Sequence, residues 1–389
     1  MRCRKRAALA TDSVAIMKLR ALRLQAGPAA LRHVQAHGLK PDHVRVIPAA
    51  AGGPKGLILS PLDQWLFGEW LRQGQYGVQL IGASIGAWRM ATACLPDPRA
   101  GFAQLAHDYI HQHYELDPGQ KRPTAWQVSA VFGDTLRAFF EPPLAPILQH
   151  PRYRLHVLTS RGRRLLRREH PWRSALGFGL AVAGNAWRRR ALGGWLERVV
   201  FSNRSGLPFA SDGMPTRQVS LSERNFHAAL QASCSIPFVL QAVHDIAHAP
   251  EGAYWDGGLI DYHLHLNYSG AMPFIASDAG LTGDGADSGI VLYPHFQSRV
   301  VPGWLDKHLR WRHRATAYLD HVLLLSPRPE WVRTLPGGKL PDRSDFVRYA
   351  DDEPLRIRIW QGAVREAEQL VDEWQRWLEQ PDPACLEPL

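Results

Sequence analysis

The chain has 389 residues, enough for two average domains or for one large domain with insertions. Its apolar content of 45% is ordinary for a globular protein and sufficient for a sizeable core. The 46 basic residues exceed the 36 acidic ones, and the net charge of +10 favours an anionic partner such as nucleic acid or an anionic membrane surface.

The cysteines and the first residues of the chain indicate in which cellular compartment the protein is expected. The four cysteines are scattered, without a C-x-x-C pair or metal-ligand spacing, which favours a reduced, cytoplasmic protein over a disulfide scaffold. The basic start is not followed by the apolar run of a signal peptide. No stretch of about 20 uncharged apolar residues exists, so no spanning helix is expected. We expect a disordered leader over 1–17, with Met1 and Met17 both candidate starts, and a single domain over 18–389.

The first third of the chain predicts alternating helices and strands. Residues 18–38 have the periodicity of one amphipathic helix that breaks at Gly27-Pro28 and ends at Gly38. The elements expected next are a strand at 43–48, a helix at 55–70, a strand beginning at Val78 and a helix at 85–95. This order predicts an α/β protein with a parallel sheet covered by helices on both faces.

The remaining elements continue this pattern. Residues 99–150 are expected to be mostly helical, and 161–198 form a separate basic and apolar segment. The other predicted strands are 154–159, 199–201, one ending at 254–255, 290–293 and 321–325, and the other predicted helices are 225–233 and a C-terminal helix at 355–378.

A serine motif lies between the strand at Val78 and the helix that follows it. Gly82-Ala83-Ser84-Ile85-Gly86 matches G-x-S-x-G, the nucleophile elbow in which a sharp strand-to-helix turn exposes a serine hydroxyl. The two glycines allow the turn to pack closely against the neighbouring strand and helix. The motif predicts Ser84 as a nucleophile.

A glycine-rich turn, Ala51 to Gly56, follows the strand at 43–48 and opens a helix. Its backbone N–H groups and the helix N-terminus can hold a phosphate or a developing oxyanion. The sequence is neither a P-loop nor G-x-G-x-x-G, which favours the oxyanion. Pro54 has no N–H, so Gly52 and Gly53 are the expected donors.

The third motif is Asp256-Gly257-Gly258, which directly follows a predicted strand. An aspartate there can reach a site at the sheet edge, although D-G-G is also a common turn. Asp261 is a second carboxylate nearby, expected mainly to cap a helix or make a structural hydrogen bond.

Taken in order over residues 44–262, these motifs resemble the patatin-like phospholipase family, and Ala232 to Phe238 resembles a further segment upstream of that family's aspartate. The resemblance implies a three-layer α/β/α fold with a mostly parallel sheet and helical insertions, and a lipid acyl hydrolase without metal or cofactor. The chain departs from the family at Ala51, where a third glycine is usual, and at Pro54. The implied site is a Ser84–Asp256 catalytic dyad, oxyanion donors Gly52 and Gly53 with Lys55 behind them, elbow glycines Gly82 and Gly86, and Asp-motif glycines Gly257 and Gly258.

Other interpretations of the same residues stay open. A Ser-His-Asp triad could use His263, His265 or His295, although the glycine turn and the D-G-G motif favour the dyad. The acyl-enzyme could pass its acyl group to an alcohol, or the substrate could be an aliphatic polyester. A catalytically silent lipid-binding protein on this fold is a further alternative.

The segment 161–198 has arginine clusters on either side of the uncharged stretch 174–187 and carries several tryptophans. This composition is typical of peripheral contact with an anionic membrane, or of a lid over an acyl pocket. The alternative is an insertion that packs on the core with solvated arginines. We expect no nucleic-acid partner, because no recognised binding motif accompanies the basic patch.

Overall fold

The computed structural model describes residues 19–115, 119–120, 122–279 and 289–389. The leader expected over 1–17 lies outside the described residues.

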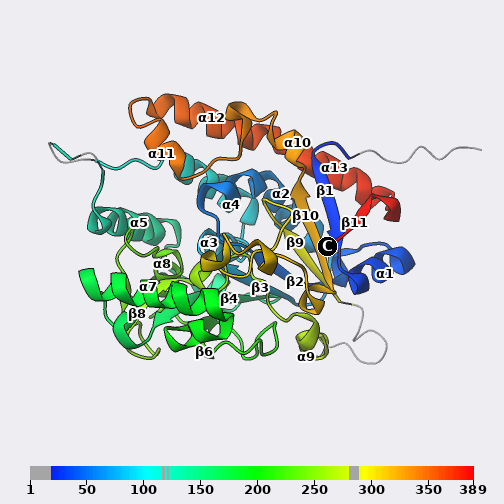
Figure 1. Cartoon of the computed structure of the whole chain (residues 1–389). Helices are drawn as coiled ribbons and strands as arrows, with labels where there is room; N and C mark the ends of the chain where they lie inside the picture. Colours follow the sequence, from blue (N-terminus) through cyan, green and yellow to red (C-terminus); the bar gives the residue numbers. More distant parts are fainter. Residues whose placement is uncertain (1–18, 116–118, 121, 280–288) are drawn as a thin grey trace, which may run out of the picture.

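A large, mostly parallel sheet forms the centre of the molecule, with helices around it (Figure 1). The strand order is β11-β1-β10-β9-β2-β3-β4-β5-β6, and β8 pairs with β4 and with β7. The prediction of a three-layer α/β/α architecture is confirmed. The strands are β1 Leu22–Ala26, β2 Val44–Ala49, β3 Val78–Ala83, β4 Tyr153–Gly162, β5 Leu196–Ser202, β6 Thr216–Ser220, β7 Val243–His244, β8 Ala253–Asp256, β9 Ile290–Pro294, β10 Val322–Pro327 and β11 Leu386–Pro388.

The middle strands are buried along their whole length. Every residue of β2, β3, β9 and β10 is buried, as expected for parallel strands covered on both faces. Strands β2, β3 and β4 run parallel side by side, so the carboxyl ends of β2 and β3 lie next to each other along one side of the sheet. The glycine turn follows β2 and the serine elbow follows β3 at these carboxyl ends.

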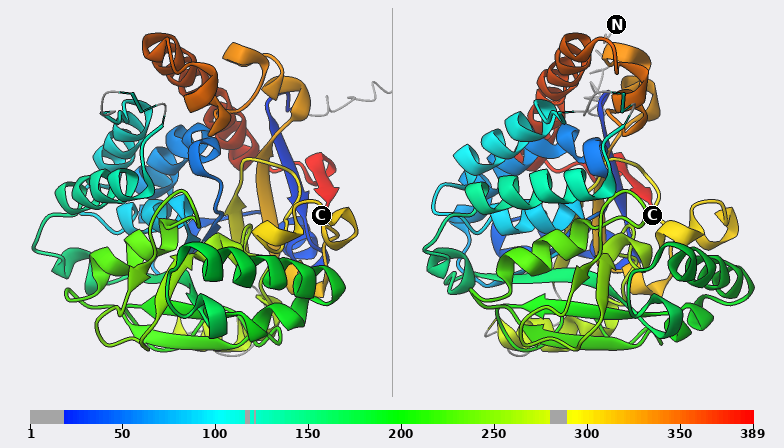
Figure 2. Two further views of the ribbon diagram at one scale, coloured as in Figure 1. Left: turned by 60° about the vertical axis from the view of Figure 1, so that its left-hand side comes forward. Right: turned by 90° about the vertical axis from the view of Figure 1, so that its left-hand side faces the viewer.

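The helices lie along the sheet and at its ends. Helix α3 packs on β2, β3 and β4, and α13 contacts β1. Helices α12 and α7 lie at opposite ends of the molecule in both views of Figure 2. The helices are α1 Pro28–His37, α2 Ser60–Trp65, α3 Ile85–Thr92, α4 Pro98–Ile110, α5 Ala125–Phe139, α6 Ala145–Leu148, α7 Pro171–Trp187, α8 Phe226–Cys234, α9 Met272–Asp278, α10 Pro329–Val332, α11 Ser344–Arg348, α12 Glu353–Glu366 and α13 Glu368–Glu379.

The prediction of one helix over 18–38 is wrong in its first half. Residues Leu22–Ala26 form β1, which pairs antiparallel with β10 and parallel with β11. The alternation of Leu22, Arg23 and Leu24 suits a strand, and partners from the far end of the chain complete it. Only Pro28–His37 is helical.

Two other predicted segments have different limits. The C-terminal helix is two helices, because α12 ends before Ala367 and α13 starts after it. The segment 161–198 is not wholly an insertion, since its ends belong to β4 and β5; its middle forms α7 and a short 3₁₀ helix at Arg189–Gly194.

Within the part of the chain that the structure describes, no helix has both the length and the apolar content needed to cross a bilayer.

Candidate active site

The serine elbow has the geometry that its motif predicts. Strand β3 ends at Ala83 and α3 begins at Ile85, so Ser84 alone makes the turn, with φ of 57° and ψ of −131°. A non-glycine residue with positive φ costs about 1–3 kcal/mol and persists where the surroundings enforce it. A Cβ on Gly86 would lie 1.9 Å from the Ala49 carbonyl oxygen, so only glycine allows this approach.

Ser233 fixes the elbow from a second direction. Its hydroxyl accepts a hydrogen bond from the Ser84 amide at 2.9 Å and donates one to the Leu158 carbonyl at 2.6 Å. Ser233 is fully buried near the end of α8, so a single side chain links that helix, β4 and the strained turn. The segment Ala232 to Phe238 therefore supports the position of Ser84.

Asp256 lies directly against the serine hydroxyl. Ser84 Oγ donates a hydrogen bond to Asp256 Oδ2 at 2.7 Å, and the Gly258 amide donates one to Asp256 Oδ1 at 2.7 Å. Asp256 is the last residue of β8, opposite Thr159 of β4, which brings the D-G-G turn beside the elbow. Both carboxylate oxygens are therefore oriented by donors.

The surroundings of Asp256 suit a proton acceptor. Burial raises the pKa of Asp256 to about 6, against the lowering effects of the Ser84 hydroxyl, the Arg343 charge and the Gly258 amide. A carboxyl with a pKa near 6 is ionised at neutral pH yet is a stronger base than an ordinary aspartate. Its hydrogen bond to Ser84 is also the contact that a base needs with a nucleophile.

The histidines of the triad alternative lie elsewhere. His263 Nδ1 accepts a hydrogen bond from the Val301 amide at 3.1 Å, and His295 Nδ1 accepts one from the Gln297 amide at 2.9 Å. Burial lowers the pKa of His263 well below its usual range, that of His265 to about 4 and that of His295 to about 3. Among the described residues, no histidine forms a hydrogen bond with Ser84 or Asp256.

Asp261, the second carboxylate of this stretch, belongs to a separate ion pair. The Arg198 guanidinium donates to both of its oxygens, at 2.6 and 2.7 Å, and also to Asp212 at 2.7 Å. Burial opposes the charge on Arg198, but these two carboxylates outweigh it and raise the pKa of Arg198. The structural hydrogen bond expected for Asp261 is present.

The glycine turn contributes to the same cavity, though unequally. Gly52 lines it together with Ser84 and Asp256, whereas Gly53 lines a neighbouring cavity beside Tyr109. Gly53 has φ of 57°, a left-handed conformation that favours glycine. The Ala51 amide donates to the Tyr262 carbonyl at 2.9 Å and is engaged, while no carbonyl of the described residues accepts from the Gly52 amide.

The cavity above the serine has a volume of about 260 Å³. Lys55, Lys307 and Arg343 all line it, and only the first of these had a sequence motif. Burial lowers the pKa of Lys55 and brings that of Lys307 to about 8, with the neighbouring cations adding to the effect on Lys307. The other lining residues are Ala51, Gly52, Ser84, Ile236, Asp256, Gly258, Leu259, Tyr262, Trp304, Asp342 and Ser344.

The structure thus brings three predicted motifs to one place. Ser84, Asp256 and Gly52 line a single cavity with Lys55 and Gly258, while Gly82, Gly86 and Gly257 pack in the turns behind it. Sequence reasoning missed Lys307 and Arg343, which come from loops without a recognisable motif, and it did not assign Ser233 a contact with the elbow.

Comparison with known proteins gives no further guide to the site. Models of known protein families do not match the sequence, and a search of curated proteins finds no match either.

Proposed function

We propose that this protein is a serine acyl-hydrolase of the patatin-like kind, which cleaves carboxylic esters of lipids through Ser84 and Asp256. The observation that carries the proposal is the 2.7 Å hydrogen bond from Ser84 Oγ to Asp256 Oδ2, at a strained strand-to-helix turn that lines a cavity. A hydroxyl, a carboxylate with a raised pKa and a nearby glycine turn together supply the parts that ester hydrolysis needs.

In the proposed reaction, Ser84 Oγ attacks the ester carbonyl carbon while Asp256 accepts its proton. The tetrahedral intermediate collapses, the protonated Asp256 returns the proton to the departing alcohol, and an acyl-enzyme remains. Water then attacks the acyl carbon with Asp256 again taking the proton, which releases the acid and restores the serine.

Stabilisation of the oxyanion falls to the glycine turn. The Gly52 amide is the leading proposed donor, because Gly52 lines the cavity of Ser84, the Ala51 amide is already bonded to Tyr262 and Pro54 has no N–H. The amide of Gly53, which lines the neighbouring cavity, is the proposed second donor. Loss of one such donor costs about 10²–10³ in rate in other enzymes. Lys55, beside this turn, adds positive charge near the developing oxyanion.

A fluorophosphonate probe tests the nucleophile. We expect it to label the wild-type protein at Ser84 and not to label Ser84→Ala, since the reagent forms a covalent bond to an activated serine hydroxyl. Ser205→Ala, a serine on another loop, is the matched control and should label like the wild type. Labelling that persists in Ser84→Ala would remove Ser84 from this role.

We further propose that helix α7 holds the protein at an anionic membrane surface. Its buried positions, including Ser174, Phe178 and Ala181, face the molecule, and its outer face is apolar rather than charged. Trp172 is 59% exposed and Trp187 is 84% exposed. A surface helix normally carries polar residues outward, so this face is suited to insertion among lipid head groups.

Charge and position favour a lipid surface as the occupant of this face. Arg173 and Arg188 are exposed at the two ends of α7, and no carboxylate of the described residues pairs with either. Asn185 of α7 donates to Asp306 at 2.8 Å, in the short helix that begins with the cavity residue Trp304. The apolar face is therefore attached beside the cavity that would receive an ester from the membrane.

Vesicle sedimentation tests this surface. Wild-type protein is expected to sediment with vesicles that contain anionic phospholipid and much less with neutral ones, and Leu180→Ser/Trp187→Ser should lose most of this binding. Trp126→Ser, which changes a 64% exposed tryptophan of α5, is the control and should bind normally. Equal binding by the double variant would exclude α7 as the docking face.

A further inference from the structure

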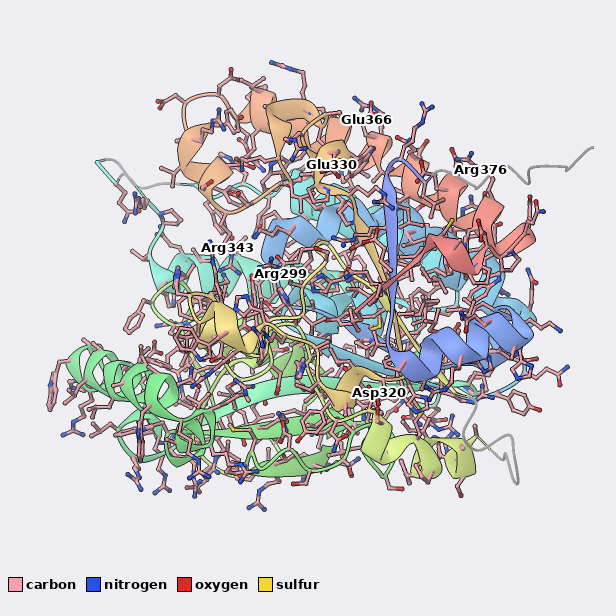
Figure 3. All side chains as sticks on the ribbon, turned by 45° about the vertical axis from the view of Figure 1, so that its right-hand side comes forward. Arg299, Asp320, Glu330, Arg343, Glu366 and Arg376 are labelled. Atoms are coloured by element: carbon pink, nitrogen blue, oxygen red, sulfur yellow. The ribbon has the colours of Figure 1, made fainter. Side chains whose placement is uncertain are left out.

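Phe296 lies directly behind the glycine turn. Strand β9 ends at Pro294 and pairs in parallel with β2, the strand that precedes the turn, so the chain leaves both strands on the same side of the sheet. The Cβ that Gly52 lacks would lie 2.4 Å from Cε1 of the Phe296 ring and 2.5 Å from Cζ. The backbone of Gly52 therefore packs closely against this ring. Figure 3 labels Arg299, on the chain that continues from Phe296, near the middle of the view.

The same ring is the neighbour of a cation of the cavity. Lys55 lines the cavity with Ser84, and its Nζ lies 5.8 Å from the centre of the Phe296 ring, within the range of a cation–π contact. Gly52 and Lys55 are the groups proposed to stabilise the oxyanion. One aromatic side chain therefore adjoins both of them.

Phe296 is itself held in place by the sheet. Its side chain is buried and stacks on His295, with ring centres 4.5 Å apart and planes tilted by 26°. The ring of His263 lies edge-on at 5.3 Å. The His295 amide donates a hydrogen bond to the Leu325 carbonyl of β10 at 2.8 Å, which attaches this stretch to the central strands. The ring can therefore act as a fixed support.

The glycine turn needs such a support because it has no side chains of its own to hold it. Glycine has more conformational freedom than any other residue, yet an oxyanion donor is effective only when it is in place before the reaction. The Ala51 amide is fixed by the Tyr262 carbonyl at 2.9 Å, whereas the Gly52 amide donates to no carbonyl of the described residues. The three atoms nearest to the missing Cβ of Gly52 all belong to Phe296.

We propose that Phe296 is a positioning residue, which holds the Gly52 amide and the Lys55 ammonium where the oxyanion forms. This inference rests on the proposed function, because only an acyl transfer at Ser84 gives the oxyanion. The negative charge develops only as the serine attacks, so the effect of Phe296 is expected in the transition state and not in the binding of substrate.

Steady-state kinetics with p-nitrophenyl butyrate test this role. Phe296→Leu keeps an apolar side chain but loses the ring, and we expect kcat to fall by about 10–10²-fold with KM changed by less than about twofold, since a small displacement of a catalytic group has an effect of this size. Phe67→Leu is the matched control, because Phe67 is also buried but packs on Phe102 and Tyr153. It should lower Tm in a similar way and keep the wild-type kcat.

An oxyanion mimic gives a readout that a general loss of packing would not change. With hexyl trifluoromethyl ketone, Ser84 Oγ adds to the carbonyl carbon, Asp256 takes the proton, and the carbonyl oxygen becomes an oxyanion. Its Ki should rise in Phe296→Leu by the factor by which kcat/KM falls, while the Ki of the matching alcohol, which forms no adduct, should not change. Lys55→Met should have a smaller effect on kcat in Phe296→Leu than in the wild type, because the two residues act together.

Nuclear magnetic resonance tests the contact without any turnover. Labelling with ¹³C-alanine and ¹⁵N-glycine selects the amides of glycines that follow an alanine, and Gly52 is one of them. Ala51→Ser identifies the Gly52 signal by removing its labelled neighbour. This signal should shift in Phe296→Leu and stay in place in Phe67→Leu.

Several results would overturn the proposal: a wild-type kcat in Phe296→Leu, a loss confined to KM, an equal loss in Phe67→Leu, or a Gly52 signal that does not shift. If Phe296→Leu does not fold, Phe296→Met, whose flexible apolar side chain fills a similar space, is measured in its place. If the wild type neither labels at Ser84 nor turns over esters, the proposed function fails, and the Gly52 signal alone decides whether Phe296 holds the turn.

Discussion

Asp256 and Asp261 lie on the same short stretch, and both are almost fully buried, yet their surroundings differ. Asp261 meets the Arg198 guanidinium through two hydrogen bonds and is neutralised by it. Asp256 receives bonds from a hydroxyl and an amide, neither of them charged, and its pKa rises to about 6 because of burial. The first arrangement satisfies the charge of the carboxylate within the chain, and the second is the one that the proposed function requires of a base.

The difference shows that two buried carboxylates of one short stretch can have unlike partners, neutral donors for Asp256 and a guanidinium for Asp261. A buried aspartate with a bidentate arginine has its charge satisfied within the chain, and removal of one partner leaves the other uncompensated. A buried aspartate whose partner is a serine hydroxyl has a proton within reach, and the nearby charges of Arg343 and Lys307 act on it without a direct ion pair. We therefore expect Asp256→Asn to lower turnover with little loss of stability, and Asp261→Asn to lower stability.

The largest expected effect is on turnover by Asp256→Asn. The amide cannot accept the serine proton as a base, so we expect hydrolysis of a short-chain p-nitrophenyl ester to fall by about 10²–10⁴-fold. Steady-state kinetics of wild type and variant measure this, with circular dichroism to show that the fold is kept. Turnover near the wild-type rate would point to another base and would contradict the role proposed for Asp256.

The same variant is not expected to lose stability. The folded pKa of about 6 is above the ordinary 3.8, so the contribution of Asp256 to stability is fully present below about pH 4 and is lost as pH rises through 6. An uncharged asparagine avoids that loss at neutral pH.

The next largest effect is on stability, in Asp261→Asn. The variant leaves Arg198 buried without one of its two carboxylates, which is expected to cost about 3–5 kcal/mol in the free energy of unfolding. Urea denaturation at pH 7 measures this against Asp134→Asn, which breaks an exposed pair with Arg137 and should change little. A stability loss in Asp256→Asn that equals the loss in Asp261→Asn would contradict the distinction.

The smallest effect is the pH dependence of the rate. Because Asp256 must be ionised to accept a proton, kcat/KM for an uncharged ester should fall tenfold per pH unit below about pH 6 and be level above it. If kcat/KM of Asp256→Asn still falls below about pH 6, another group is responsible for the decline.

The parts of the site that could be predicted from sequence are the turns whose conformation depends on residues close together in the chain. The elbow around Ser84 and the turn at Gly52 have strand, glycines and helix within about a dozen residues, so their conformation is encoded nearby. Asp256 likewise ends its strand and is followed at once by the two glycines of its turn. That these turns meet in one place was predicted only from the family resemblance. The sequence does not show it directly, because the sheet brings together segments that are far apart in the chain.

The parts that sequence could not predict depend on distant partners. Lys307 and Arg343 reach the cavity from irregular loops, where neither periodicity nor spacing marks them. Strand β1 has five residues whose pairing is with β10 and β11, each more than 290 positions away. The end of α12 before Ala367 has neither a glycine nor a proline to mark it.

The approach of Gly86 to the Ala49 carbonyl also limits how this chain can diverge. No residue larger than glycine fits there, and the same holds at Gly82, where a methyl would lie 2.4 Å from the Gly86 carbonyl. Sequence changes among descendants of this chain are therefore expected to spare both glycines, and with them the position of the Ser84 hydroxyl.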